Sequence, residues 1–293
     1  MLTSEQKRFF ETFGFLIIKD FFSQNEINTI SKEFNYRSKV ASNIEPFDGT
    51  KRQTIDMSDD DSPFFASLLD NEQLLSIGKT IHNRILPWST NIDRHVDNTF
   101  WHHDAGGYEW YGVKFAFYLD SLTSQNGALR VIPGSHKQPF HDELAHIKNL
   151  NYSWIRKNYT AASKSSFIAP IPSYACESNP GDLVIFDYRI FHASLGGSKD
   201  RHMCTVNFIN YPKTPKQLAI TIHEAKNYFK DTHNTAAPWN PKKVVSENWL
   251  ANTNQNPNRQ WGIDQWRKFS KMKVSDTGYK IETVEGKLKV IPI

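Results

Sequence analysis

Residues 181–194 read GDLVIFDYRIFHAS, in which a turn dipeptide precedes an apolar, strand-like run and a loop that delivers a histidine. Similar runs, rich in β-branched and aromatic residues, occur on both sides of this stretch and are separated by turn signals such as SQNG, PGS and NPGD. These runs are NIDRHV (91–96), YGVKFAFYLD (111–120), ALRVI (128–132) and HMCTVNFINY (202–211). The pattern predicts a β-rich core.

The composition is that of a globular protein that can bury a full core, because its 293 residues are 39% hydrophobic and 13% aromatic. The formal net charge is only +4, and the basic residues are scattered, which argues against nucleic acid or an acidic membrane as a partner. The N-terminus MLTSEQKRFF lacks the apolar core of a signal peptide, so we expect a cytoplasmic protein. Cys176 and Cys204 are then expected to remain thiols.

The whole chain is predicted to form one domain. Capping boxes at Thr3 and Ser23 predict two helices, with the strand FGFLIIK (13–19) between them. Helix is also expected around ELAHIKNL (143–150) and in the tail near 222–230 and 259–271. The expected parts are N-terminal helices (1–90), a β-rich core (91–212) with a lid insertion (136–180), and a C-terminal extension (213–293).

The segment WHHDAGG (101–107) contains two candidate metal ligands. Because residues i and i+2 share one face of a strand, His102 and Asp104 can bind one ion together, whereas His103 points away. His192, at the end of the stretch quoted first, is the best third ligand among the eleven histidines. Two histidines and one carboxylate form the facial triad of non-haem Fe(II) oxygenases, which leaves coordination positions open. The alternative is a chance H-x-D without a metal.

Arg201 and Ser194 are candidates for binding 2-oxoglutarate. An oxygenase that uses this diacid needs a permanent cation for the carboxylate far from the metal, and the planar guanidinium of arginine offers two parallel hydrogen bonds. Arg201 follows His192 by nine residues, and Ser194 shares the face of His192 if the strand continues. The alternatives are a surface arginine and a turn hydroxyl.

Other side chains near these motifs have both functional and structural interpretations. Tyr108 and Trp110, in a Gly-containing loop after the metal motif, form aromatic walls for a substrate or pack against the insertion. Lys114 receives no role, and His136, after a Pro-Gly turn, is expected to be structural. Three further histidines are expected to lie away from the metal: His95, His103 and His202.

Four segments together make the chain resemble the phytanoyl-CoA dioxygenase-like family of Fe(II)/2-oxoglutarate-dependent oxygenases. They match its opening helix–strand–helix, its W-H-x-D metal motif, its N-G-x-L-x-V-x-P-G-S-H signature, and its distal histidine and 2-oxoglutarate arginine. The segments are LTSEQKRFFETFGFLIIKDFFSQNEINTI (2–30), WHHD (101–104), NGALRVIPGSHK (126–137), and PGDLVIFDYRIFHAS (180–194) with DRHMCTVNF (200–208). Two features depart from the family pattern: Arg201 lies closer to His192, and the tail after about residue 212 has no counterpart.

The resemblance implies a double-stranded β-helix, or jelly roll, of eight strands in two sheets with helices packed on one side. It also implies that His102, Asp104 and His192 bind Fe(II), that Arg201 anchors 2-oxoglutarate, and that Ser194 assists.

The activity implied by the resemblance is hydroxylation of an unactivated C–H bond, with 2-oxoglutarate and O2 as co-substrates and succinate and CO2 as products. Asp104 fills the position that halogenating relatives leave to chloride, so halogenation is disfavoured. Desaturation or ring formation would use the same ligands. No dense basic cluster lies beside the motifs, which favours a small metabolite over an acyl-CoA.

Bacterial natural-product biosynthesis is the expected setting, with a cylindrospermopsin-type alkaloid as one candidate substrate. The alternatives are an acyl-CoA hydroxylase of the same family, a non-catalytic cupin-type metal-binding protein, and a zinc hydrolase that uses the same three residues.

Overall fold

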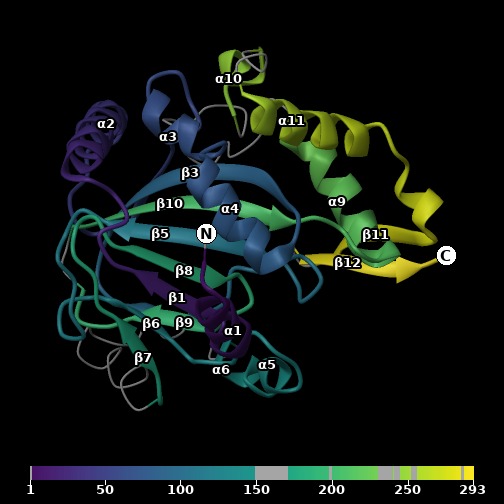
Figure 1. Cartoon of the computed structure of the whole chain (residues 1–293), viewed down its shortest axis with the longest axis horizontal. Coiled ribbons are helices and arrows are strands. Elements are labelled where there is room, and N and C mark those ends of the chain that lie inside the picture. Colours follow the sequence, from purple (N-terminus) through teal and green to yellow (C-terminus); the bar gives the residue numbers. More distant parts are fainter. Residues whose placement is uncertain are drawn as a thin grey trace.

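The computed structural model describes residues 2–148, 171–197, 200–229, 240, 245–251, 256–284 and 287–293. Two antiparallel sheets pack face to face as a jelly roll, and helices cover the outer face of the larger sheet (Figure 1). The larger sheet has the order β1 (Phe15–Ile18), β8 (Leu183–Asp187), β5 (Gly112–Tyr118), β10 (Arg201–Asn210), β3 (Ile85–His95) and β2 (Gln53–Asp56). The smaller sheet has the order β4 (Thr99–His102), β9 (His192–Ser194), β6 (Leu129–Val131) and β7 (Tyr174–Cys176).

The mainly β fold class with flanking helices is confirmed. Four strands in each sheet, β3 to β10, form the expected jelly roll, and β1 and β2 extend the two edges of the larger sheet. A hairpin of β11 (Tyr279–Val284) and β12 (Lys287–Pro292) stands apart from both sheets. The helices in the described part of the chain are α1 (Ser4–Phe13), α2 (Gln24–Ile44), α3 (Pro63–Leu68), α4 (Glu72–His82), α5 (Phe140–Glu143), α6 (Ala145–Lys148), α9 (Pro215–Tyr228), α10 (Glu247–Ala251), α11 (Pro257–Ser270) and the 3₁₀ helix η1 (Val274–Thr277).

Alternation along β5 separates the two sides of the larger sheet. Val113, Phe115 and Phe117 belong to the main hydrophobic core, which the helices cover. Ala116 and Tyr118 belong to a second core between the two sheets. Because side chains alternate along a strand, the even-numbered residues of β5 face the interior of the jelly roll. That interior contains the polar side chains described below.

Both predicted capping boxes are present. The side chains of Thr3 and Ser23 accept hydrogen bonds at the first turns of α1 and α2, and β1 lies between these helices as expected. In the described part of the chain no helix has the length and apolar character needed to cross a membrane. Cys176 and Cys204 are both buried, and neither forms a disulfide.

The sequence patterns did not predict β2 or the first half of β3. Pro87 lies inside β3, and a proline within an apolar run argues against a strand because it cannot donate to the sheet. The register between β3 and β10 shifts between Asn207 and Phe208, next to Pro87. This irregularity accommodates the proline in a six-stranded sheet.

The predicted lid insertion begins with α5 and α6, while its centre, residues 149–170, lies outside the described residues. Its far end contains β7, which pairs with β6 in the smaller sheet. Residues 174–176 therefore belong to the jelly roll itself.

The C-terminal extension packs onto the jelly roll. Trp249, Ile263 and Trp266 lie in the same hydrophobic core as the strands of the larger sheet. Trp266 Nε1 donates to the backbone carbonyl of Pro87 at 2.7 Å, and its ring stacks on Tyr228 with centroids 4.9 Å apart. Helices were expected near 222–230 and 259–271, whereas α9 and α11 occupy 215–228 and 257–270.

Candidate metal centre

The pairing of β4 with β9 brings the predicted triad together. His102 and His192 are register partners, and their ring centroids lie 4.2 Å apart. Asp104 lies just beyond β4, where its N–H and that of Ala105 both donate to the carbonyl of Tyr188, at 2.8 and 3.1 Å. His102, Asp104 and His192 each offer one ligand atom, and all these atoms lie within 4.8 Å of one another. The cluster can therefore hold a metal ion.

Backbone carbonyls fix the tautomers of both histidines. His102 Nδ1 lies 2.7 Å from the carbonyl of Phe100, and His192 Nδ1 lies 3.0 Å from that of Ile190. Because a carbonyl oxygen only accepts, each Nδ1 carries the proton and each Nε2 keeps a free lone pair. The Nε2 atoms of His102 and His192 lie 3.9 and 3.6 Å from oxygens of Asp104.

The protonation states of the cluster suit a metal ion. Burial lowers the pKa of His192 to about 3, and the neighbouring His102 contributes in the same direction. Burial also lowers the pKa of His102. Although burial alone would raise the pKa of Asp104, Lys114 and the two imidazoles outweigh that effect and lower it. At neutral pH the cluster presents two neutral imidazoles and one carboxylate, a set that fits Fe(II) with positions left open.

The neighbouring histidines lie as follows. His103 faces away from the cluster, with its ring 4.9 Å from that of His141 and 5.3 Å from that of Phe191. His95 is buried and is not part of the His102–Asp104–His192 cluster. It is the register partner of Arg201 and therefore faces the interior of the jelly roll. Burial lowers its pKa to about 3, and the charge of Arg52 adds to the effect.

Arg201 is buried at the start of β10. Its Nη2 donates to Ser194 Oγ at 2.9 Å, and this oxygen lies 3.0 Å from Thr99 Oγ1. Within the described residues, Nε and Nη1 of Arg201 have no hydrogen-bond partner. A buried guanidinium with unused donors suits a carboxylate ligand, because unpaired buried polar groups are costly. The structure thus brings Arg201 and Ser194 together, and it adds Thr99, which no sequence pattern singled out.

The glycine of the NGALRV segment makes room for this guanidinium. Gly127 has a φ of +105°, and a Cβ built on it would lie 2.4 Å from Arg201 Nη1. Glycine adopts such a φ readily and leaves the space free.

Gly127→Ala is expected to weaken binding of 2-oxoglutarate by about tenfold or more, because a displacement of about 1 Å at a binding group has large effects. Calorimetric titration of the Mn(II)-loaded protein with 2-oxoglutarate measures this. Gly278→Ala is the matched control, since Gly278 has a φ of +79° but nothing within 4 Å of its built Cβ. Equal affinities of the two variants would contradict the assignment.

The PGSH turn supports the loop that leads to His192. Ser135 Oγ accepts a hydrogen bond from the N–H of Phe191 at 2.8 Å. His136 packs over the turn before β1, where a Cβ on Gly14 would lie 2.4 Å from its Nδ1. These contacts agree with the structural role expected for His136.

A buried ion pair at the end of β8 supports the same loop. Asp187 accepts from Arg189 Nε and Nη2 at 2.8 and 2.7 Å. His82 Nε2 lies 3.9 Å from Asp187, and burial lowers the pKa of His82 to about 4.

The stability of the protein is expected to fall between pH 6.5 and 4, in part because of His82. Its pKa is about 4 when folded and near 6.5 in a model peptide, so below pH 6.5 the unfolded chain takes up a proton that the folded chain excludes. Denaturant unfolding at pH 7 and pH 4.5 measures the effect. The wild type is expected to lose roughly 2 kcal/mol more than His82→Gln over this interval. Parallel losses would contradict the role of His82.

A polar chamber of about 360 Å³ opens beside the cluster. Lys114 connects the two, because its Nζ lies 2.7 Å from Asp104 Oδ2 while its side chain lines the chamber. The other lining residues are Arg52, Thr54, Asp56, Ser89, Asn91, Asp93 and Thr205. All of them are polar or charged.

Tyr108 and Trp110 line a different pocket, of about 260 Å³, together with Lys216 of α9 and Leu288 of the hairpin. The Tyr108 ring lies 5.2 Å from that of His141, and the Trp110 ring 5.9 Å from that of Trp88. Both rings therefore take part in packing, and their predicted contact with substrate remains a proposal.

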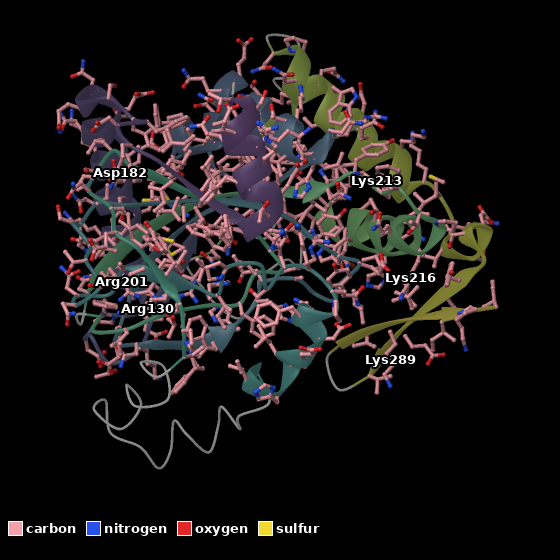
Figure 2. All side chains as sticks on the ribbon, turned by 60° about the horizontal axis from the view of Figure 1, so that its bottom comes forward. Arg130, Asp182, Arg201, Lys213, Lys216 and Lys289 are labelled. Atoms are coloured by element: carbon pink, nitrogen blue, oxygen red, sulfur yellow. The ribbon has the colours of Figure 1, made fainter. Side chains whose placement is uncertain are left out.

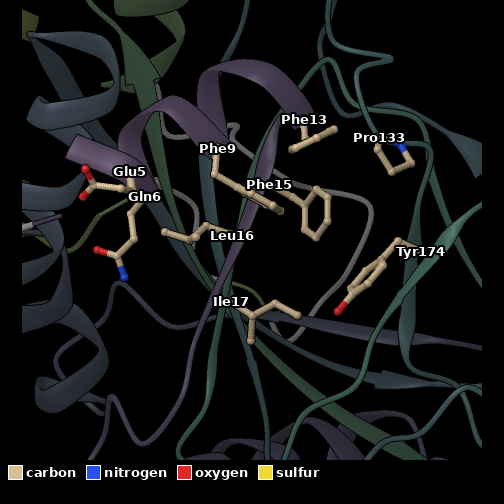
Figure 3. Close-up of a pocket in the computed structure, with 9 residues that line it drawn as sticks. All are labelled: Glu5, Gln6, Phe9, Phe13, Phe15, Leu16, Ile17, Pro133 and Tyr174. Atoms are coloured by element: carbon tan, nitrogen blue, oxygen red, sulfur yellow. The ribbon is translucent and has the colours of Figure 1, made fainter. Parts of the chain in front are cut away.

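A larger groove of about 630 Å³ contains none of the triad residues. It lies along α1 and β1, where Phe9, Phe13 and Phe15 form one wall and Tyr174 of β7 lies opposite (Figure 3). Apart from Glu5 and Gln6 its lining is apolar or aromatic, and it contains no histidine.

Comparison with known proteins identifies the family. The phytanoyl-CoA dioxygenase family model matches residues 10–203, a span that includes the triad, Ser194 and Arg201. The chain belongs to the phytanoyl-CoA dioxygenase family. This confirms the family inferred from the sequence, whose description names a dioxygenase.

Known proteins similar to this phytanoyl-CoA dioxygenase family protein include a hydroxylase and a carbocyclase. L-proline trans-4-hydroxylase of Streptomyces griseoviridis is 32% identical over 85 residues, which is 29% of this chain and 28% of that enzyme. Among solved structures, the α-ketoglutarate-dependent carbocyclase SnoK from nogalamycin biosynthesis has a TM-score of 0.54 at 17% identity, covering 71% of this chain and 84% of its own.

HygX from Streptomyces hygroscopicus, solved with nickel and 2-oxoglutarate, also has a TM-score of 0.54, at 18% identity, covering 73% of this chain and 88% of its own. At these identities the structural similarities establish the fold alone.

Proposed function

We propose that this protein hydroxylates an unactivated C–H bond of a small polar metabolite, consuming 2-oxoglutarate and O2 and releasing succinate and CO2. The observation that supports this most directly is the convergence of two proton-free Nε2 atoms and one carboxylate within 4.8 Å. In addition, Arg201 at the start of β10 is buried, donates to Ser194 of β9 and has unused donors.

Each chemical role that the proposed reaction requires falls to a particular side chain of this chain. His102 and His192 would hold Fe(II) through Nε2, and Asp104 through a carboxylate oxygen. Arg201 and Ser194 would bind the far carboxylate of 2-oxoglutarate, with Thr99 orienting the serine hydroxyl. Once bound, iron and 2-oxoglutarate would activate O2, and O2 would supply the oxidising power for attack on a C–H bond. His192, Ser194 and Arg201 are buried, which shields the co-substrate end of the site from bulk water, whereas His102 and Asp104 stay partly exposed.

The shape and polarity of the chamber favour a small polar substrate. The chamber beside Asp104 holds about 360 Å³ and has polar walls, which suits a hydrophilic metabolite better than a fatty acyl chain. The same polar walls disfavour an acyl-CoA, whose acyl chain would need an apolar cavity. Lys213, Lys216 and Lys289 lie around α9 and the hairpin, at the other end of the molecule from Arg201, and none of them lines this chamber (Figure 2). A natural product, such as a polar alkaloid of the cylindrospermopsin type, falls within this substrate class.

The test is substrate-triggered turnover. The purified protein is supplied with Fe(II), 2-oxoglutarate and a panel of polar metabolites, and succinate, O2 uptake and substrate mass are followed. The proposal predicts equal amounts of O2 consumed, succinate formed and product formed. The product should be 16 mass units heavier than the substrate, which is the mass of one oxygen atom. Turnover without O2 would instead indicate a hydrolase, and metal binding without succinate formation on any panel member would indicate a binding protein.

A further inference from the structure

Lys114 occupies an unusual place for a lysine. It lies in the middle of β5, which is flanked by β8 and β10, and its register partners are Phe186 and Asn207. Its side chain faces the interior of the jelly roll and is only 18% exposed. Moving an ammonium group out of water is costly unless nearby groups compensate, so a lysine at this position needs acceptors.

The anionic partner of Lys114 is Asp104, which is also a candidate metal ligand. Lys114 Nζ lies 2.7 Å from Asp104 Oδ2, and no other acceptor pairs with it in the described part of the chain. An ammonium group has three N–H donors. Because Asp104 is also a candidate metal ligand, a bound metal ion would share its negative charge. Lys114 would then lack a full counter-ion and would keep donors for another group.

Lys114 and Arg201 approach the triad from opposite sides. Along β4, Thr99 contacts Ser194 and hence the Arg201 end, His102 follows, and Asp104 with Lys114 comes last. Along β10, Lys114 is paired with Asn207, six residues from Arg201, or about 20 Å along the strand. If Arg201 anchors 2-oxoglutarate, Lys114 lies on the side left for the substrate.

The rest of the polar chamber is internally paired. Asp93 accepts from Arg52 Nε at 2.9 Å and from Thr54 Oγ1 at 2.5 Å. Asn207 Nδ2 lies 3.2 Å from both the carbonyl oxygen of Ser89 and Asn91 Oδ1. Of the two cations that line this chamber, Arg52 pairs with Asp93, whereas Lys114 pairs with a residue of the metal cluster.

We propose that Lys114 is the specificity-determining residue for the substrate and binds a carboxylate that the substrate presents beside the metal. This inference rests on the proposed function, because it assumes metal and 2-oxoglutarate in the same centre. The substrate class is then a small polar carboxylic acid, such as an amino or hydroxy acid, whose remaining polar groups meet the hydroxyl and amide side chains of the chamber.

Acetate is the minimal probe for this subsite. The full chain is loaded with Mn(II) and saturating 2-oxoglutarate, and the paramagnetic relaxation of acetate methyl protons is titrated, with acetamide as the uncharged control. In the wild type we expect acetate, and not acetamide, to bind near Mn(II). Lys114→Gln is expected to reduce acetate affinity about tenfold or more through loss of a charge-assisted bond, and Lys114→Arg is expected to retain much of it.

The matched control is Lys19→Gln, because Lys19 Nζ also lies 2.7 Å from a carboxylate oxygen, that of Asp182, but on the surface. Lys19→Gln should leave acetate relaxation unchanged. Circular dichroism of Lys114→Gln checks that the variant is folded, and Lys114→Arg serves as the test if it is not.

Binding of Mn(II) and 2-oxoglutarate by each variant separates the remaining outcomes. The proposal requires that Lys114→Gln bind both within a few-fold of the wild type. Weaker Mn(II) binding would mean that Lys114 only positions Asp104, and weaker 2-oxoglutarate binding would mean that it holds the keto-acid end of the co-substrate. Either result overturns the proposal, as does the absence of acetate binding in the wild type. Failure of the wild type to bind Mn(II) and 2-oxoglutarate would instead refute the proposed function.

Discussion

His102→Ala is expected to abolish 2-oxoglutarate turnover and to weaken Fe(II) binding by more than about 100-fold, because loss of groups that merely support a metal ligand already costs 10- to 100-fold. The imidazole of His102 offers its Nε2 to the cluster, since Nδ1 is bonded to the carbonyl of Phe100. Anaerobic titration with Fe(II) and measurement of succinate formation test the two effects separately.

His103→Ala is the matched control, because it removes an imidazole from the next residue of the chain. The ring of His103 lies against His141 and Phe191, outside the cluster. We expect this variant to bind Fe(II) as the wild type does, with some loss of thermal stability. If the two variants lost metal binding equally, the assignment of the triad would be wrong.

Arg201→Ala is expected to weaken 2-oxoglutarate binding by about 30-fold or more while leaving Fe(II) binding intact. Truncating one partner of a buried, hydrogen-bonded charge pair costs about 2–5 kcal/mol, and each 1.4 kcal/mol is about a tenfold change in affinity. Calorimetric titration of the Mn(II)-loaded variant with 2-oxoglutarate measures the loss. The buried position of Arg201 makes this effect larger than that expected for a surface arginine.

Two further variants define what the arginine contributes. Arg201→Lys keeps the charge but not the planar pair of donors, so we expect an affinity between those of the wild type and the alanine variant. Arg130→Ala removes an arginine that donates to the carbonyl of Ser124 at 2.9 Å, and it should bind 2-oxoglutarate normally. Retention of full affinity by Arg201→Ala would exclude Arg201 as the anchor.

Strand alternation was enough to group the candidate ligands. The spacing of His102 and Asp104 placed both on one side of a strand, and the structure joins them to His192 through the pairing of β4 with β9. The apolar runs at β5, β8 and β10 were long enough to be recognised. These features depend on local patterns, and local patterns are what a sequence shows directly.

Features that depend on distant contacts were not predictable in the same way. Lys114 is an isolated polar residue in an apolar run, and its proximity to Asp104 follows from the packing of one sheet on the other. The N-G-x-L segment was recognised, but the need for Gly127 became clear only from the position of Arg201 Nη1. The hairpin β11–β12 was also missed, although YKIETV (279–284) begins with alternating apolar and polar residues, because no strand was predicted in the tail.

The hydrogen bond from the Trp266 indole of α11 to β3 limits how this protein can be truncated or fused to parts of its relatives. Trp266 Nε1 donates to the carbonyl of Pro87, at the irregular step of a strand whose other end carries His95. The stretch that matches the family, residues 10–203, does not include this tryptophan. A fragment limited to residues 10–203, or a chimaera that carries the tail of a relative, would lack the indole that donates to the carbonyl of Pro87. A functional chimaera should therefore take the C-terminal extension and the jelly roll from the same protein.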